Sequence, residues 1–203
     1  VTNITRLLKK IRLMKIYIVK ETATDETRVA LVPEVAKKFI KEGFEVFLEK
    51  NAGHLSKFTD EDYSSLGVNI DDNKECISDA DVIFCVRIPD DDLINKIKSG
   101  ACLIGLLNPY DNREKLELLS KKSINAFSME LIPRSPRAQS MDVLSSQANL
   151  AGYRAVIESV EEFEKAIPMM MTAAGTVTPA KILVIGAGVA GLQAIATAKR
   201  LGG

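Results

Sequence analysis

Apolar positions along the chain recur in two patterns, short continuous runs and longer segments in which they follow helical spacing. A continuous run such as 81–87 is typical of a strand that is covered on both faces of its sheet. Helical spacing after Pro33, ended by Gly43, predicts a helix with a proline in its first turn. The predicted strands are 15–19, 44–50, 81–87, 101–107 and 124–130, and the further helices of this region are 60–66, 91–100 and 113–122.

This alternation predicts an α/β fold with a mostly parallel, doubly wound sheet, because consecutive parallel strands need a crossover that a helix supplies. Ligands on such sheets bind beyond the carboxyl ends of the strands. The pattern then breaks at 131–144, where two prolines, two arginines and small polar residues indicate a loop. A long amphipathic helix is expected over about 145–165.

A glycine-rich turn near the end of the chain has the context of a dinucleotide-binding unit. A strand predicted over 182–185 leads into Gly186, Gly188 and Gly191, the G-x-G-x-x-G pattern, and helical spacing follows to Lys199. The first glycine permits a tight turn, the second lets a pyrophosphate approach, and the third lets helix and strand pack closely. The helix N-terminus adds N–H donors and partial positive charge. The alternative is a purely structural glycine turn.

The predicted dinucleotide-binding domain is the start of a Rossmann fold, truncated after one strand and one helix. The acidic residue that holds the adenosine ribose lies ~20 residues beyond the glycines. That position falls past Gly203, so the sequence does not decide between NAD and NADP. The predicted organisation is a flexible leader at 1–13, an N-terminal α/β domain at 14–140, the active-site loop end with a linker helix at 141–168, and the first βα unit at 169–203.

Residues 1–13 are basic and mildly amphipathic. Their interpretation as a flexible leader places the start of the first domain at Met14. A targeting presequence is the alternative, although the apolar core of a secretory signal is missing.

The composition fits a packed, folded chain, with 46% hydrophobic and 27% charged residues. The 27 Lys and Arg residues balance the 27 Asp and Glu residues, so no overall positive field points to nucleic acid. No stretch approaches the ~18 consecutive apolar residues that span a bilayer. Any membrane association would therefore go through partners or through segments outside this chain.

Few residues offer metal-binding or acid–base chemistry. Cys76, Cys85 and Cys102 lack metal-binding spacing and are interpreted as reduced, inert core thiols, which fits a cytoplasmic protein. The only histidine, His54, follows a predicted strand in a loop and is expected to have a surface or packing role. No metal site is predicted.

The loop between the predicted domains carries three side chains with binding chemistry. Arg134 can donate several hydrogen bonds in a planar fork, and Asp142 can orient it. Gln139 can donate and accept at once, as ribose hydroxyls and a carboxamide require. The alternative interpretation is a solvated linker with an incidental ion pair, which would contribute little to stability.

Three segments give the chain a resemblance to a known family. PRSPRAQSMDVLSSQANLAGYRAV (133–156) and MMMTAAGTVTPAKILVIGAGVAGLQAIATAKRLG (169–202) resemble the signature of the alpha subunit, or NAD(H)-binding component, of proton-translocating NAD(P) transhydrogenases. ETATDETRVALVPE (21–34) resembles the same superfamily, which includes alanine dehydrogenase. The resemblance extends from Met14 to Gly203.

The resemblance implies that the chain binds NADH and passes a hydride to NADP⁺ on a separate component, in a reaction coupled to proton translocation. The implied partners are the NADP(H)-binding and membrane components and, for the full-length protein, a second copy in a homodimer. The implied location is cytoplasmic and peripheral to the inner membrane through partner subunits. Direct hydride transfer between two nicotinamides needs no general base, only two rings held at reacting distance.

The resemblance also implies roles for residues of the loop and of the helix after it. Arg134 would contact the bound dinucleotide and pair with Asp142. Gln139 would reach towards the nicotinamide ribose of the NADP(H) on the partner component. Ser145 would lie near the nicotinamide end, and Tyr153 would either cover the site or serve only in packing.

For the phosphates of NAD, the resemblance implies a cradle formed by Gly186, Gly188, Val189 and Gly191. Arg137 also matches the loop of the family, with a phosphate or ribose contact as its expected role.

Two other functions stay open. An amino-acid dehydrogenase resembling alanine dehydrogenase would hold a 2-oxo acid with a basic pair, whose positions Arg28 matches and Arg87 approximates. Its proton-transferring histidine corresponds here to Asn108, which cannot exchange a proton at neutral pH, so this function is disfavoured. In a third, non-enzymatic interpretation, the chain is a truncated remnant that is inactive alone or works only when a separate chain supplies the rest. We expect weak or no NADH binding by the chain alone.

Overall fold

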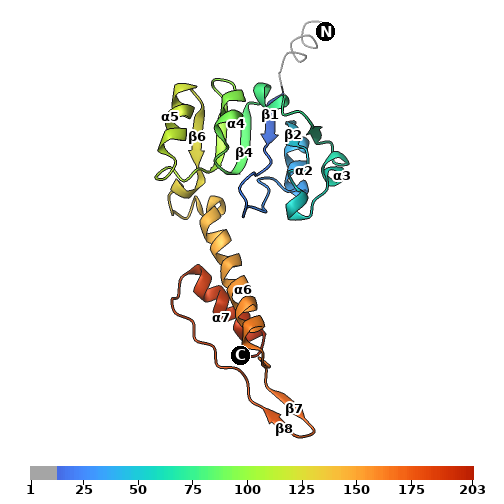
Figure 1. Cartoon of the computed structure of the whole chain (residues 1–203), viewed down its shortest axis with the longest axis vertical. Helices are drawn as coiled ribbons and strands as arrows, with labels where there is room; N and C mark the ends of the chain where they lie inside the picture. Colours follow the sequence, from blue (N-terminus) through green and yellow to red (C-terminus); the bar gives the residue numbers. More distant parts are fainter. Residues whose placement is uncertain (1–12) are drawn as a thin grey trace. The chain divides into compact units, whose positions relative to one another are not determined.

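The computed structural model describes residues 13–203, so the predicted leader, except for Leu13, lies outside the described residues. The described chain divides into two compact units, the first ending at Ile132 and the second running from Pro133 to Gly203. Each unit has its own elements (Figure 1) and its own cluster of packed side chains.

A six-stranded parallel sheet organises the first unit, with the strand order β3-β2-β1-β4-β5-β6 (Figure 1). The order reverses between β1 and β4, the point at which doubly wound sheets leave a crevice beyond their carboxyl ends. The predicted α/β fold with a doubly wound parallel sheet is confirmed, and every strand predicted in this unit is present. The strands are β1 (Lys15–Ile18), β2 (Glu45–Glu49), β3 (Asn69–Asp71), β4 (Val82–Arg87), β5 (Cys102–Leu106) and β6 (Asn125–Ser128).

The apolar pattern of the sequence did not predict β3. This strand lies at the edge of the sheet, where Asn69 pairs in register with Phe47, and within the strand only Asp71 is buried. An edge strand of three residues can be held by the backbone of its single neighbour, so its sequence carries no apolar run.

The strands are connected by helices α2 (Pro33–Lys41), α3 (Asp60–Ser64), α4 (Asp91–Lys96) and α5 (Arg113–Lys121), and by 3₁₀ turns η1 (His54–Ser56), η2 (Cys76–Asp79) and η3 (Met129–Leu131). Helix α4 is shorter than predicted, because Ile97 adopts extended backbone and its side chain, only 2% exposed, enters the core. Likewise, η3 replaces the last residues of the strand predicted over 124–130.

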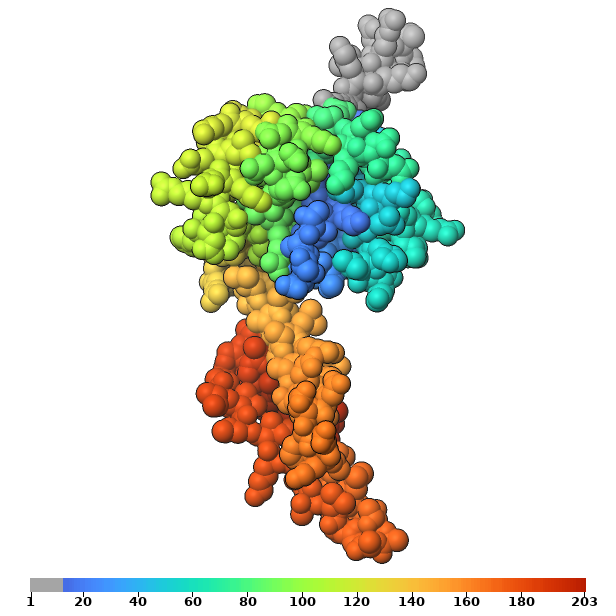
Figure 2. Space-filling view, viewed as in Figure 1, coloured from blue at the N-terminus to red at the C-terminus, as the bar shows by residue number. Residues whose placement is uncertain are grey.

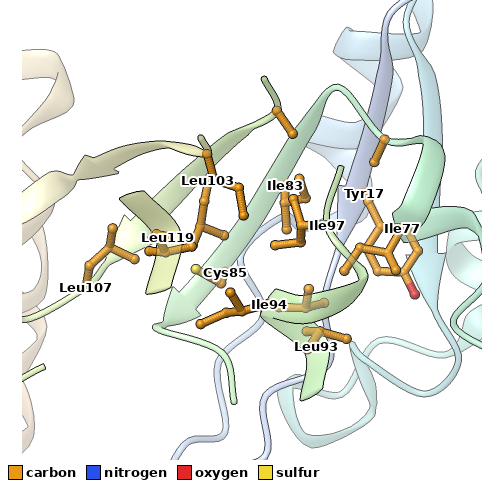
Figure 3. Packing of buried hydrophobic residues seen from close by; sticks show 14 residues of the cluster. Tyr17, Ile77, Ile83, Cys85, Leu93, Ile94, Ile97, Leu103, Leu107 and Leu119 are labelled. Carbon is orange, nitrogen blue, oxygen red and sulfur yellow. The ribbon is translucent and has the colours of Figure 1, made fainter. Parts of the chain in front are cut away.

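Side chains of β1 alternate between the two faces of the sheet. Ile16 and Ile18 pack into one apolar cluster, whereas Tyr17 packs into the other, which continues across β4 through Ile83. Figure 3 shows this second cluster, with Tyr17 beside Ile77. Because both faces of the sheet are covered, β1 is apolar and buried from Ile16 to Ile18, as the sequence pattern predicted.

The three cysteines are free thiols. Cys85 is buried in the cluster that contains Tyr17, and burial raises the pKa of its thiol. Cys76 and Cys102 are partly buried. A thiol that stays protonated is a poor nucleophile, so the prediction of an inert core thiol is confirmed for Cys85.

The second unit contains η4 (Gln139–Met141), the long helix α6 (Val143–Phe163), the strands β7 (Met170–Thr172) and β8 (Gly175–Val177), and α7 (Val189–Arg200). The helix predicted over about 145–165 is present as α6. The two strands form an exposed antiparallel hairpin that the sequence pattern did not predict. This hairpin extends beyond the C-terminal end of α6 (Figures 1 and 2). Although α6 has 21 residues, no helix within residues 13–203 is both long and apolar enough to span a membrane.

The prediction of a strand over 182–185 is wrong for this structure, because these residues adopt no regular structure. Within the described residues no strand pairs with this segment, and the side chains of Leu183 and Ile185 are 85% and 91% exposed. A β-strand requires a neighbour that pairs with its backbone N–H and C=O groups. An apolar run without such a neighbour remains irregular.

A buried carboxylate ties the loop after β1 to the end of β4. Glu26 is 2% exposed, and its two oxygens accept hydrogen bonds from Arg28 Nε at 2.6 Å and from Arg87 Nε at 2.8 Å. The hydrogen bond from Arg28, supported by that from Arg87, lowers the pKa of Glu26 to about 2. Glu26 is therefore ionised at neutral pH and holds both guanidinium groups at the carboxyl end of the sheet.

We predict that Glu26→Gln lowers the free energy of unfolding by ~1–3 kcal/mol at pH 7, because it removes the charge that both arginine contacts use. The pKa of Glu26 is lowered from 4.5 to about 2 in the folded protein. Its contribution is therefore complete above about pH 4.5 and is lost as the pH falls towards 2. Urea denaturation across this range should show the difference between wild type and variant shrinking.

The control is Glu42→Gln, the same change at an exposed position, which should alter the urea midpoint only slightly. A Glu26→Gln variant as stable as the wild type at pH 7, or a stability difference that does not depend on pH, would contradict this role.

Candidate functional site

The turn that leads into α7 has a separate physical reason for each glycine. Gly186 has a φ of +107°, a conformation that residues with a Cβ rarely adopt. A Cβ on Gly191 would lie 2.0 Å from the carbonyl oxygen of Gly186, so only glycine allows this close approach. At Gly186 and Gly188, by contrast, a Cβ would meet nothing within 4 Å. The turn therefore packs tightly against the start of α7 at Gly191, and it has open space beside Gly186 and Gly188.

The N-terminus of α7 leaves backbone donors beside this open turn. Gly188 precedes the helix, no side chain among the described residues caps it, and the Leu192 N–H donates to the Gly188 carbonyl at 2.9 Å. The N–H groups of Val189 and Gly191 precede this bond and can serve an anion, and the helix dipole adds partial positive charge. Open space, close backbone approach and unused donors fit the pyrophosphate of a dinucleotide.

Three of the predicted loop residues lie around one small cavity. Arg134, Gln139 and Asp142 all line a cavity of about 260 Å³ within the second unit. The side chains of Arg134 and Gln139 are exposed, so their hydrogen-bonding groups are accessible to a ligand. Arg137 is exposed as well but does not line this cavity.

Asp142 also begins α6. Its carboxylate accepts hydrogen bonds from the Ser145 N–H at 2.9 Å and from Ser145 Oγ at 2.7 Å, the arrangement of a helix N-cap. These two bonds lower the pKa of Asp142, and the positive charge of Arg134 contributes less. Sequence reasoning missed this cap, although an aspartate directly ahead of a helical run is a known start signal.

The Asp142 carboxylate accepts its hydrogen bonds from Ser145, and among the described residues it forms no ion pair with Arg134, whose charge nevertheless contributes to its lowered pKa. A cap contact lies within one turn of chain, whereas an ion pair needs a long side chain to be held in one exposed geometry. Ser145 and Tyr153 do not line the cavity, and Tyr153 is 49% exposed on α6. The structure therefore gathers Arg134, Gln139 and Asp142, and leaves Tyr153 apart.

A second cavity, of about 470 Å³, lies at the carboxyl ends of β4 and β5 in the first unit. Its lining includes the basic residues Arg28, Arg87 and Lys115 and one acidic residue, Asp90. Both arginines donate to Glu26, and Lys115 Nζ donates to the Pro89 carbonyl at 2.7 Å. The cationic groups of this cavity are thus partly engaged by the protein itself.

Asn108 lines the same cavity, two residues after the end of β5, and has a φ of +44°. Its backbone N–H donates to the Glu130 carboxylate, and its Nδ2 donates to Asp111 Oδ2 at 2.7 Å. An amide neither takes nor gives a proton at neutral pH, so Asn108 cannot perform an acid–base step. His54 lies exposed in η1 and does not line this cavity.

Two family models match the chain. The first, described as "Alanine dehydrogenase/PNT, N-terminal domain", matches residues 17–151. The second, described as "Alanine dehydrogenase/PNT, C-terminal domain", matches residues 155–203. One match ends and the next begins within α6.

Curated relatives include the first part of the NAD(P) transhydrogenase subunit alpha of Rhodospirillum rubrum, 53% identical over 195 residues. The protein of the same name from Rickettsia prowazekii is 50% identical over 194 residues. The alanine dehydrogenase of Methanococcus maripaludis is 28% identical over 193 residues. Each comparison covers 93% of this chain and 51% of the relative, so the chain spans about half the length of these relatives.

Among solved structures too, a transhydrogenase is more similar to this chain than an alanine dehydrogenase is. The crystal structure of transhydrogenase from Sinorhizobium meliloti gives a TM-score of 0.88 at 50% identity and covers 93% of this chain and 54% of that chain. An L-alanine dehydrogenase gives a TM-score of 0.78 at 26% identity and covers 93% of this chain and 53% of that chain. The resemblance inferred from 133–156 and 169–202 is confirmed. Because the matched regions together extend from residue 17 to residue 203, this chain belongs to the alanine dehydrogenase/PNT family.

Proposed function

We propose that this chain is the NAD(H)-binding part of an NAD(P) transhydrogenase, which passes a hydride from NADH to NADP⁺ held on a partner component. The observation that carries the proposal is that the second unit contains both the open glycine turn and the cavity lined by Arg134, Gln139 and Asp142. Identities of 53% and 50% to transhydrogenase sequences, against 28% to an alanine dehydrogenase, support it.

In this proposal the glycine turn serves the phosphates of NAD(H). The backbone N–H groups at Gly188, Val189 and Gly191 donate to the pyrophosphate, and the positive φ of Gly186 aims the chain into the helix. Arg137 adds a phosphate or ribose contact from the loop. Backbone donors suit this role, because a helix N-terminus holds them in place before the ligand arrives.

The loop serves the nicotinamide end of the dinucleotide. Arg134 contacts the dinucleotide and pairs with Asp142, whose carboxylate Ser145 holds at the cavity. Gln139 reaches the nicotinamide ribose of the NADP(H) on the partner component. Ser145 lies near the nicotinamide end and holds the loop to α6. Tyr153, on the same helix but outside the cavity, serves either to cover the site or in packing.

NAD(H), when bound, supplies the nicotinamide ring that carries the hydride. The residues of this chain bind and orient that ring, and they move no proton because the hydride passes directly between two rings. The lowered pKa of Asp142 agrees with a site that moves no proton, since it keeps the carboxylate ionised at neutral pH and unsuited to act as an acid.

The remainder of the proposed assembly follows from the family. Membrane components carry the coupled proton translocation, and this chain lies on the cytoplasmic side, peripheral to the inner membrane through those partners. The full-length protein forms a homodimer. In domain terms, 14–140 is the N-terminal domain, 141–168 is the loop end and linker helix, and 169–203 is the first βα unit of the NAD-binding domain.

An activity like that of alanine dehydrogenase is the second candidate, favoured by the three basic residues among those that line the cavity of the first unit. Two features of that cavity weigh against it. Arg28 and Arg87, the pair that would have to bind the carboxylate of a 2-oxo acid, both donate to Glu26 instead. Asn108 stands where the chemistry requires a histidine that exchanges a proton.

We predict that the 203-residue chain alone binds NADH with a dissociation constant above the micromolar range. Within the described residues, no strand lies beside 182–185 to carry an acidic residue for the adenosine ribose. Titration followed by NADH fluorescence measures the affinity. A dissociation constant in the micromolar range would contradict the prediction.

We predict that Gln139→Asn slows hydride transfer at least about tenfold and changes NADH affinity less than about twofold, because the shorter side chain no longer spans to the second ribose. The assay uses this chain extended by the rest of the family's C-terminal domain, together with the NADP(H)-binding component. It follows transfer from NADH to an NADP⁺ analogue and, separately, NADH binding.

Gln147→Asn, the same change at an exposed position of α6 outside the cavity, is the matched control and should leave both quantities unchanged. Equal losses of rate and affinity in Gln139→Asn would argue against a bridging role. NADH oxidation that depends on pyruvate and ammonium would instead support the second candidate.

A further inference from the structure

Gly152 lies where α6 packs against α7, two helices that run side by side (Figure 1). The residue is buried, and a Cβ built on it would lie 2.1 Å from the carbonyl oxygen of Ala190. Its next neighbours are the carbonyl carbon and the Cα of Ala190, at 2.8 and 2.9 Å. All three are backbone atoms, so no side-chain rotation can make room for an added methyl group.

Ala190 is the second residue of α7 and directly precedes Gly191. Gly191 is the residue at which α7 closes on the carbonyl oxygen of Gly186. Successive residues in the first turn of α7 therefore contact two different parts of the chain, α6 through Ala190 and the glycine turn through Gly191. The position of the turn relative to α6 depends on both contacts.

A hydrogen bond supports the same packing. Asn149 Nδ2 donates to Gln193 Oε1 at 3.2 Å, which joins the turn of α6 before Gly152 to the turn of α7 after Ala190. Glycine in the interior of a helix is unfavourable compared with alanine, so its presence in α6 calls for a reason such as close packing. The contact with Ala190 supplies that reason.

The helix that carries Gly152 begins at Asp142, which lines the loop cavity. Its packing on α7 therefore connects the two parts of the proposed site, the loop cavity and the phosphate-binding turn. We propose that Gly152 is a positioning residue for the bound dinucleotide, because its missing side chain sets how closely the turn approaches α6. This inference rests on the proposed function, in which the turn binds the phosphates of NAD(H).

The test compares the wild-type chain with Gly152→Ala and with the control Ala151→Ser, which adds one atom at the neighbouring exposed position. Amide chemical shifts of residues 186–191 are recorded on the isotope-labelled chain, first without ligand and then during titration with millimolar NADH. Thermal unfolding of each variant is measured in parallel, so that a change in stability is separated from a change in affinity.

Gly152→Ala is expected to move the amide resonances of Val189, Ala190 and Gly191 in the ligand-free chain. It should also weaken NADH binding at least about fivefold, since displaced donors no longer match the pyrophosphate. Ala151→Ser should change neither quantity. If Gly152→Ala keeps wild-type resonances and affinity and unfolds at a higher temperature, as alanine does in an unobstructed helix, the proposal is overturned.

Asn149→Ala keeps the test decisive if Gly152→Ala does not fold. It removes only the hydrogen bond to Gln193, so it should move the same resonances by a smaller amount, and no movement would overturn the proposal. If NADH moves no resonance of residues 186–191 in the wild-type chain, the titration is repeated on this chain joined to the rest of the family's C-terminal domain, and no movement there would overturn the proposed function. The ligand-free shifts still decide whether Gly152 positions the turn.

Discussion

Backbone hydrogen bonding between neighbouring strands is the constraint that explains most of this structure. β1 is paired on both sides, with β2 and β4, and its alternate side chains fill the two apolar clusters of the first unit. The run at 182–185 is equally apolar but has no neighbour within the described residues, and it stays irregular. Similar sequences therefore form a strand in one unit and not in the other, because a strand exists only where its backbone groups are paired.

In the second unit, the main constraint is the close approach of backbone segments at two glycines. Cβ atoms at Gly152 and Gly191 would lie 2.1 and 2.0 Å from carbonyl oxygens, so both positions exclude any side chain. These two contacts hold the start of α7 against its surroundings while the turn remains open at Gly188. Anion binding at such a place depends on backbone N–H groups and the helix dipole, which explains why small residues rather than charged ones mark it in the sequence.

Charge is used differently in the two units. In the first, Glu26 accepts hydrogen bonds from Arg28 and Arg87 at the carboxyl ends of the strands, where ligands of this fold bind. In the second, Asp142 caps a helix, and Arg134 remains at the cavity without an ion pair to that carboxylate. A guanidinium that is paired within the protein has fewer donors to offer a ligand.

The helices and all strands of the first unit except β3, the glycine turn and the family could be predicted from local patterns, because apolar runs, helical spacing and short motifs are properties of neighbouring residues. The edge strand β3, the hairpin and the irregular segment at 182–185 could not, since pairing depends on which segments meet in space. The same holds for the site. Its residue types were readable in the loop, but whether Asp142 binds Arg134 or Ser145 depends on distances that the folded chain sets.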